Sequence, residues 1–455
     1  MMRSSLLIMS VLVTTGGPSL APSGAMATLH HHTPDVREVL ASARGVAPTI
    51  CLLAADGVAS SGRWGGGGGY WDAPAMSIGA EVRMRIREMQ RARLGSADQR
   101  ALLDALGADD ACVRHLSATI IGRSDDKSFV APLTARTTSS AAGERQSAAI
   151  ALGLLGARDA VDPLLRMLRD PSPDVRADAV WALGRVGEKS AARNVAVLLR
   201  DQYPDVRASA VVALGRMQAK DNVEELLRVL RDDSSPEVRR VAAWALGQLE
   251  ARAAIGGLSS ALRSDRSSEV REMAAWALGE MNSRESGEVL TNALKSDESA
   301  EVRETAAWAL GELNTKASAD ALADALARDR ESEVRATAAW ALGQIHAERA
   351  PAPLIAALRD SDDDVRLKAA WALSQIADPT AVPAVSDALK QDQPERVRQA
   401  LVRALLQSGE HSDDALTGLL QSKDDKTREL AVRALTGRRG PWPWPWPWPR
   451  PRPTP

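Results

Sequence analysis

Few residues in this chain are of types that carry out chemistry, and they are widely spaced. The run His30 to His32 follows Thr28, and a chain cleaved before Thr28 would begin Thr-Leu-His. A free amine, two amides and the imidazole of the third residue form a square-planar site for Cu(II) or Ni(II). The alternative, which we favour, is a solvated tail with incidental histidines. The other histidines stand apart, at His115, His346 and His411.

Motifs that accompany catalysis are missing from the sequence. It contains no HExxH, GxSxG, Walker or CxxC pattern, which are typical of zinc peptidases, serine hydrolases, nucleotide hydrolases and thiol redox enzymes. We therefore predict a protein that is not an enzyme, with no catalytic residue, metal or cofactor. The net charge of −2 and the pI near 6.4 give no general electrostatic attraction for nucleic acid.

The first 27 residues are typical of a secretory signal peptide. Arg3 provides the positive charge, Leu6 to Val13 form an apolar core, and Ala25 to Ala27 offer small residues for cleavage. The apolar run is shorter than the roughly 20 residues that span a bilayer. We therefore predict a periplasmic or secreted protein. In an oxidising compartment Cys51 and Cys112 could pair.

The elements that must position any functional side chain belong to an internal repeat of the form V-R-x-x-A-A-x-A-L-G. Its arginine recurs at steps of 30 to 32 residues, at Arg114, Arg145, Arg176, Arg207, Arg239, Arg271, Arg303, Arg335, Arg366, Arg398 and Arg428. Arg83, another 31 residues upstream, belongs to a capping unit in this interpretation. Units repeated at a fixed period stack into solenoids, because none of them can bury its apolar face alone.

The repeat predicts an all-α solenoid of about eleven two-helix units over residues 78–437. A low-complexity segment precedes it at 28–77, with short helices at Asp35 to Ser42 and Thr49 to Val58 and a glycine run at 65–69. A tail rich in Pro, Trp and Arg follows at 438–455.

Each repeat is predicted to form two helices. The first carries an apolar stripe at helical spacing, for example Val223, Leu226, Leu227 and Leu230. The second opens with an N-cap, a proline and an acid, as in Ser235 to Glu237. A glycine eight residues after the arginine would either allow close packing or ease the exit of the chain from the helix.

Six tryptophans share one position of the second helix, five residues after the arginine. They are Trp181, Trp244, Trp276, Trp308, Trp340 and Trp371. Val212 interrupts the series, and Arg403 and Arg433 replace Trp at its end. At 100° per residue this position lies opposite the apolar face of the helix, so the row is expected on the concave side as separate aromatic platforms. Packing of each indole against the neighbouring repeat is the alternative.

One turn further, nine residues after the arginine, polar side chains follow the same surface. They are Arg185, Arg216, Gln248, Glu280, Glu312, Gln344, Gln375 and Gln407. Trp beside Gln or Glu suits ligands with apolar faces and hydrogen-bonding groups, such as peptides, Pro-rich segments or glycans. The candidate partner-binding residues are therefore the six tryptophans with Gln248, Glu280, Glu312 and Gln344. The row is not uniformly basic, which disfavours nucleic acid.

The repeated arginine itself is predicted to be structural. In most repeats an acid stands two residues before it, as Asp174, Asp205, Glu237, Glu269, Glu301, Glu333 and Asp364. We expect each arginine to bond the acid of the next repeat, which gives a ladder of charge-assisted hydrogen bonds.

Two of the repeats, EVREMAAWALGEM (Glu269 to Met281) and EVRATAAWALGQI (Glu333 to Ile345), resemble the HEAT-like repeats of the phycobilisome lyase family. The resemblance covers about residues 98–437 and implies a HEAT-like superhelix, whereas a chromophore lyase activity would rest on analogy alone. Similar arrays accompany membrane metallopeptidase sensors, whose protease motif and membrane spans are missing here.

These observations predict an exported, non-enzymatic scaffold that binds a protein or peptide along its concave face, with envelope sensing as the suggested setting. A lyase-like or chaperone accessory of another enzyme is one alternative, and envelope or glycan binding is another. The tail from Pro441 to Pro455, PWPWPWPWPRPRPTP, favours an extended polyproline II chain. It could reach a membrane surface, dock on the Trp row or have no partner.

Overall fold

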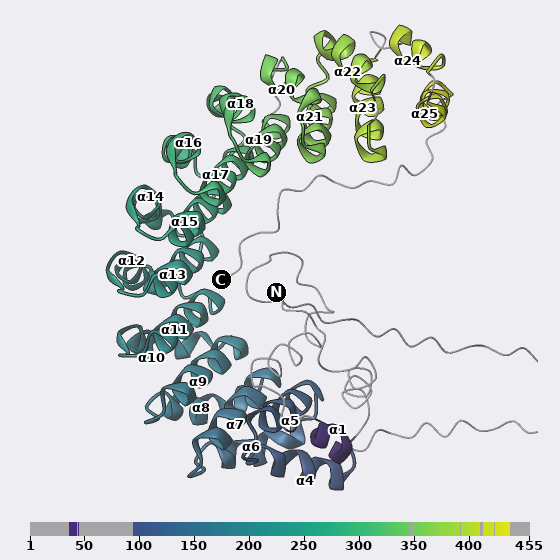
Figure 1. The fold of residues 1–455 in the computed structure, drawn as a ribbon. Coiled ribbons are helices and arrows are strands. Elements are labelled where there is room, and N and C mark those ends of the chain that lie inside the picture. The colour runs from purple at the N-terminus through teal and green to yellow at the C-terminus, as the bar shows by residue number, and fades with distance from the viewer. Residues whose placement is uncertain are drawn as a thin grey trace, which may run out of the picture.

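The computed structural model describes residues 36–42, 44, 94–345, 347, 349–391, 393–409, 413–422 and 424–436. All regular structure in these ranges is helical, and the helices follow one another as eleven pairs stacked into an arch (Figure 1). The predicted all-α solenoid is thus confirmed. Buried side chains of successive pairs form one continuous core along the arch.

The first helices of the pairs are α4 (Ser96–Ala105), α6 (Val130–Arg136), α8 (Val161–Met167), α10 (Ala192–Val197), α12 (Val223–Asp232), α14 (Ile255–Ser264), α16 (Gly287–Ser296), α18 (Ala319–Arg328), α20 (Ala352–Ala356), α22 (Val382–Leu389) and α24 (Asp413–Leu419). The second helices are α5 (Ala111–Arg123), α7 (Ala142–Leu154), α9 (Pro173–Val186), α11 (Pro204–Arg216), α13 (Pro236–Gln248), α15 (Ser268–Glu280), α17 (Ala300–Glu312), α19 (Ser332–Gln344), α21 (Asp363–Ile376), α23 (Glu395–Gln407) and α25 (Asp425–Leu435). Single 3-10 turns precede or end the first helices, as η1 (Lys127–Phe129), η2 (Arg158–Ala160), η3 (Lys189–Ala191), η4 (Leu198–Arg200), η5 (Lys220–Asn222), η6 (Arg252–Ala254), η7 (Arg284–Ser286), η8 (Lys316–Ser318), η9 (Ala357–Arg359) and η10 (Pro379–Ala381).

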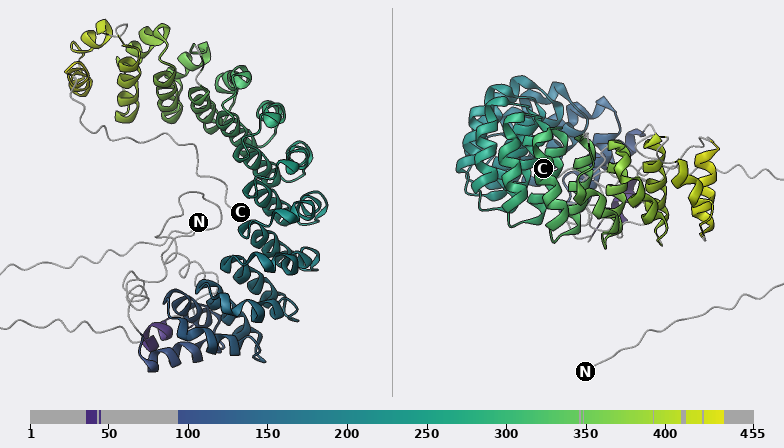
Figure 2. Two further views of the ribbon diagram at one scale, coloured as in Figure 1. Left: turned by 180° about the vertical axis from the view of Figure 1, so that it is seen from behind. Right: turned by 90° about the horizontal axis from the view of Figure 1, so that it is seen from above.

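The two helices of a pair lie on opposite sides of the arch. First helices such as α12, α14 and α16 form its convex side, and second helices such as α13, α15 and α17 line its concave side (Figure 1). The views from behind and from above show the same division and the twist of the stack (Figure 2). Side chains on the exposed face of the second helices therefore share one concave surface.

Each repeat forms the two helices that its sequence predicts, with one difference at the N-cap of the second helix. In α12, Val223, Leu226 and Leu230 are buried, as their spacing predicts. Helix α13 begins at Pro236 with Ser235 at the N-cap, but the serine side chain makes no capping hydrogen bond. Instead the backbone N–H of Ser235 donates to the carboxylate of Asp233 at 2.9 Å. The aspartate of the turn thus orders the entry to the second helix.

The chain leaves most second helices through a left-handed residue eleven positions after the repeated arginine. Gly187, Gln218, Glu250, Asn282, Asn314 and Ala377 all have positive φ there. The glycine at position eight lies one turn earlier, inside the helix, so it does not form the exit. Its role is the close packing described below.

The N-terminal segment contributes one helix to the solenoid. The expected helix at residues 35–42 is present as α1 (Val36–Ser42), which packs on α4 and α5 and buries Val36 and Val39. Other sequence predictions lie outside the described residues: the signal peptide, His30 to His32, Thr49 to Val58, residues 65–69, Cys51, Arg83, His346, His411 and the tail 438–455. In the described ranges, no helix is both long and apolar enough for a membrane span.

Candidate functional site: the concave face

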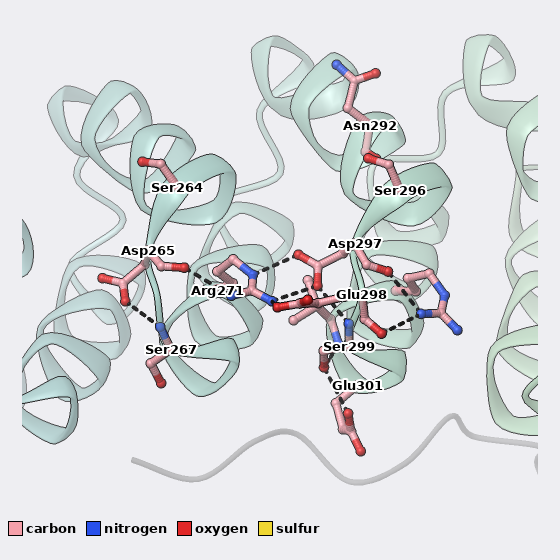
Figure 3. Close-up of polar contacts among 12 residues, drawn as sticks. Ser264, Asp265, Ser267, Arg271, Asn292, Ser296, Asp297, Glu298, Ser299 and Glu301 are labelled. Carbon is pink, nitrogen blue, oxygen red and sulfur yellow. Dashed lines mark hydrogen bonds and ion pairs between the residues drawn. The ribbon is translucent and has the colours of Figure 1, made fainter.

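The repeated arginine forms a ladder that joins each repeat to the next. Arg271 donates from Nε and Nη2 to both carboxylate oxygens of Asp297, at 2.8 and 2.9 Å. The backbone carbonyl of Asp297 in turn accepts from Nη1 of Arg303 at 2.9 Å, and Figure 3 shows these contacts. The same bidentate pair recurs as Arg145–Asp170, Arg176–Asp201, Arg207–Asp233, Arg239–Asp265, Arg303–Asp329 and Arg335–Asp360, at 2.6 to 2.9 Å.

The ladder shows that the repeated arginine has a structural role, as predicted, but the acid that it bonds is not the one we expected. We expected the acid two residues before the next arginine, whereas the partner stands six residues before it, in the turn between the two helices. There the carboxylate lies beside the preceding repeat, while the acid at the start of the second helix points to solvent. Burial alone would raise the pKa of Asp265, but hydrogen bonds from Arg239 and the Ser267 N–H outweigh it and lower that pKa.

The last two joints of the ladder differ from the seven that precede them. Arg366 of α21 donates from Nε to the neutral side chain of Gln393 at 3.0 Å and pairs within its own helix with Asp363. Arg398 of α23 then reaches Asp424 at 3.3 Å, in an ion pair that is not bidentate. The last two joints therefore have weaker electrostatic links than the seven that precede them.

The tryptophans lean across the gap between adjacent second helices. Each indole reaches the glycine at position eight of the preceding repeat: a Cβ placed on Gly279 would lie 2.9 Å from Cζ3 of Trp308 and 2.8 Å from the Cβ of Ala309. At Gly311 the corresponding distance to Trp340 is 2.8 Å. Real side-chain contacts are not this short, so only glycine leaves room for the indole. The Gly of one repeat and the Trp of the next are thus a packing pair.

The expectation of six separate aromatic platforms is therefore not met. Trp276 and Trp340 are 2 % exposed and Trp371 is 8 % exposed, because their rings lie on the preceding repeat. Trp181, Trp244 and Trp308 occupy the same position but remain partly exposed. The alternative, packing between repeats, accounts for the first three, and only the last three offer ring surface on the concave face.

The polar residues predicted beside the tryptophans do lie on the concave helices. Glu312 is exposed, while Gln248, Glu280 and Gln344 are partly buried near the ends of their helices. At the N-terminal end of the row, the guanidinium of Arg185 lies 5.7 Å from the ring centre of Trp181, which is within cation–π distance. A partner-binding role for all these residues stays a prediction.

The sequence prediction included the acids Glu280 and Glu312 but missed how many more acids gather at the centre of the concave face. Helices α13, α15, α17 and α19 carry eight glutamates, which are Glu237, Glu269, Glu272, Glu280, Glu301, Glu304, Glu312 and Glu333. The repeated arginines of these helices bond turn aspartates, which leaves Arg240, paired with Glu237 at 2.6 Å, as their one further cation. Eight acids against one base give a formal excess of seven negative charges when every glutamate is ionised. We call this surface the acidic face.

The acidic face could have been found by reading the position that follows the repeated arginine. That position lies 40° from the tryptophan on the helical wheel and holds Glu272 and Glu304 in adjacent repeats. Burial, followed by repulsion from Glu301 and Glu304, raises the pKa of Glu272 to about 7. The hydroxyl of Thr337 donates to Glu304 at 3.4 Å.

The raised pKa of Glu272 predicts a pH-dependent stability. The ordinary pKa of this group is 4.5, and the folded value is about 7. Between these values the unfolded chain ionises first, so the free energy of unfolding falls as the pH rises from 4.5 to 7 and is constant above. We expect Glu272→Gln to be more stable than the parent at pH 8 by of order 1 kcal/mol and equal to it near pH 4.5, by thermal denaturation. Glu288→Gln, an exposed change on convex α16, should not alter the dependence of stability on pH. An equal gain in stability at pH 8 for Glu288→Gln would refute the assignment of the raised pKa to Glu272.

The described residues contain few other groups that could react or bind a metal ion. Cys112 is disulfide-bonded, and the chain's other cysteine, Cys51, lies outside the described ranges. Those ranges hold no group of three or more side chains of the kinds that bind metal ions.

The repeat geometry agrees with comparisons to known proteins. The family model for HEAT repeats matches residues 130–195, 191–265, 255–343, 320–406 and 351–436. No curated protein matches the chain. Among solved structures, Kap95p bound to RanGDP has a TM-score of 0.56 at 12% identity, over 88% of this chain and 63% of Kap95p. Importin beta has a TM-score of 0.50 at 16% identity, over 89% of this chain and 61% of importin beta.

These two structures show a shared fold, at identities too low to carry function. The chain spans about three fifths of the length of each. The family match itself extends from residue 130 to residue 436, which is more than half of the sequence. The chain belongs to the HEAT-repeat family.

Proposed function

We propose that this protein is a non-enzymatic scaffold that binds a protein or peptide partner along its concave surface. The observation that carries the proposal is the acidic face, whose glutamates are not used by the ladder that holds the repeats together. Five of the eight are exposed, at Glu237, Glu269, Glu301, Glu312 and Glu333. Charge complementarity favours a basic, extended segment as the ligand and disfavours nucleic acid.

The partly exposed tryptophans are proposed to contribute apolar contacts to the same partner. Trp244 and Trp308 stand on α13 and α17, among the exposed glutamates. Aromatic surface beside hydrogen-bonding side chains is typical of peptide-binding faces. Kap95p, which has this fold, binds the protein Ran, and this supports a protein as the class of partner. Gln248, Glu280, Glu312 and Gln344 complete the proposed contact surface.

We further propose that the scaffold works outside the cytoplasm, in envelope sensing. The apolar stretch from Leu6 to Val13 and the small residues Ala25 to Ala27 support export. The disulfide at Cys112 supports an oxidising compartment. The finer resemblance of residues 269–281 to lyase repeats, and contact of the tail with a membrane surface, stay predictions.

Photo-crosslinking from the two faces of the arch tests the proposed function. A photoreactive residue is placed at Glu301 or Glu333 on the concave side, and at Glu288 or Asp320 on the convex side, in cells that make the protein. All four positions are exposed, so the probes are matched for access. We expect one identified protein to be captured from both concave positions and from neither convex position. Equal capture from both faces, or none from the concave face, would refute a concave binding site.

A further inference from the structure

The break in the tryptophan series leaves a hollow on the concave surface. Where other repeats have Trp, α11 has Val212, and a cavity of about 190 Å³ opens between α9, α11 and α13. Its lining residues are Trp181, Ala208, Ser209, Val212, Ala213, Arg216, Glu237 and Val241. The walls are thus largely apolar, while a guanidinium and a carboxylate stand at the rim.

The hollow lies beside Val212, at the position where other repeats carry a tryptophan. The preceding repeat keeps glycine at position eight, Gly184, although no tryptophan follows to pack on it. A Cβ on Gly184 would meet only the backbone and side chain of Ala213, whereas on Gly153 it would also meet the ring of Trp181. The seat for an indole is therefore present without its own indole.

We propose that this hollow binds a tryptophan of the chain's C-terminal segment, with Trp448 as the anchoring side chain. The segment 437–455 contains four tryptophans and four arginines and no acid. Trp448 brings an indole for the apolar walls and an N–H that can donate to Glu237 at the rim. The inference rests on the proposed function only in taking the concave surface as the binding face.

The arginines of the segment carry charge opposite to that of the acids next to the hollow. In polyproline II the chain rises about 3.1 Å per residue, so Arg450 stands about 6 Å and Arg452 about 12 Å beyond Trp448. Adjacent second helices lie about 8–10 Å apart. With Trp448 in the hollow beside α11, a segment that runs toward the centre of the arch therefore places the two arginines near α13 and between α13 and α15, where Glu269 is exposed.

The alternating prolines in the sequence of the segment favour this mode of binding. Alternating proline restricts the unbound chain to extended conformations, so little conformational entropy is lost when it docks. A single aromatic side chain in a preformed pocket, flanked by charge pairs at the rim, is a typical anchor of peptide binding.

The test is photo-crosslinking within the full chain. A photoreactive phenylalanine replaces Trp446, next to the anchor, and the adducts are mapped by mass spectrometry. We expect adducts on α9, α11 or α13. Val212→Trp supplies the missing indole from within the solenoid and should lower these adducts at least about tenfold. Val197→Trp, the same substitution at an exposed site on convex α10, should leave them unchanged.

A second variant covers the case in which Val212→Trp fails to fold. Trp448→Ala leaves the solenoid sequence intact and should lower the same adducts by a similar factor. Mixing heavy-isotope and light chains separates binding within one chain from binding between two copies, and either supports the hollow as the site. Adducts at other surfaces, adducts to foreign proteins alone, or adducts that persist in a folded Val212→Trp protein would overturn it. Partner capture from Glu301 is read separately, so the two proposals can fail independently.

Discussion

Replacing Trp276 with alanine is expected to lower the free energy of unfolding by about 3–5 kcal/mol, the range for a buried aromatic side chain. The indole is 2 % exposed and packs on Gly247 of the preceding repeat. Because the repeats of a solenoid contact only their neighbours, the loss should concentrate at the joint between α13 and α15. Urea unfolding followed by circular dichroism should show a lower midpoint, and hydrogen exchange should place the new opening at this joint.

Trp308→Ala is the matched control for this prediction. The residue occupies the same position in the next repeat and packs on Gly279, but it is partly exposed. It should therefore cost less stability than Trp276→Ala while removing indole surface from the concave face. An unchanged midpoint in Trp276→Ala would show that the ring is not part of the core.

Removing the carboxylate of Asp297 should be the next most damaging change, at about 2–4 kcal/mol. The side chain accepts two hydrogen bonds from Arg271 and one from the Ser299 N–H, at 2.8 to 2.9 Å. Asp297→Ala leaves the largely buried guanidinium of Arg271 with only the exposed Glu298, 3.6 Å away, as a counter-ion, and removes the hydrogen bond that orders the entry to α17. Chemical denaturation at neutral pH measures the loss.

The control for the ladder is Glu301→Ala. This acid stands two residues before Arg303, in the position where the sequence pattern predicted the partner, but it is exposed and bonds the hydroxyl of Ser299. Its removal should change the free energy of unfolding by no more than about 0.5 kcal/mol. If Glu301→Ala were as damaging as Asp297→Ala, the turn aspartate would not be the main partner of the ladder.

The comparison of Asp297 with Glu301 shows which features of the structure can be predicted from the sequence and which cannot. The period of the arginines fixes the repeat, and helical geometry then places every position on the buried or the concave side. Both inferences depend only on spacing along one chain. The partner of Arg271 depends on which turn the next repeat brings beside it, and Asp297 and Glu301 both carry a carboxylate and are only four residues apart.

The tryptophans show a second limit of the same kind. The helical wheel correctly directs position five toward the concave side, yet Trp276 and Trp340 are buried there. A wheel gives the direction in which a side chain leaves its helix but not its lean toward a neighbour. The glycine in the preceding repeat was the available signal, because a glycine that recurs inside the helix, as at Gly247 and Gly311, leaves space that only a large neighbouring group can fill.

The pairing of each glycine with the tryptophan of the following repeat also determines how the length of this arch can change. Excision of residues 269–300, one full period, would bring Trp308 onto Gly247 and leave Arg239 beside Asp265 and Arg303 beside Asp329, with every packing position filled as before. A deletion that is not a whole number of repeats would set an indole against a side chain or an arginine against no acid. The fold can therefore be lengthened or shortened by gene duplication and loss, but only in whole repeats, and each such step changes the reach of the concave surface without altering its joints.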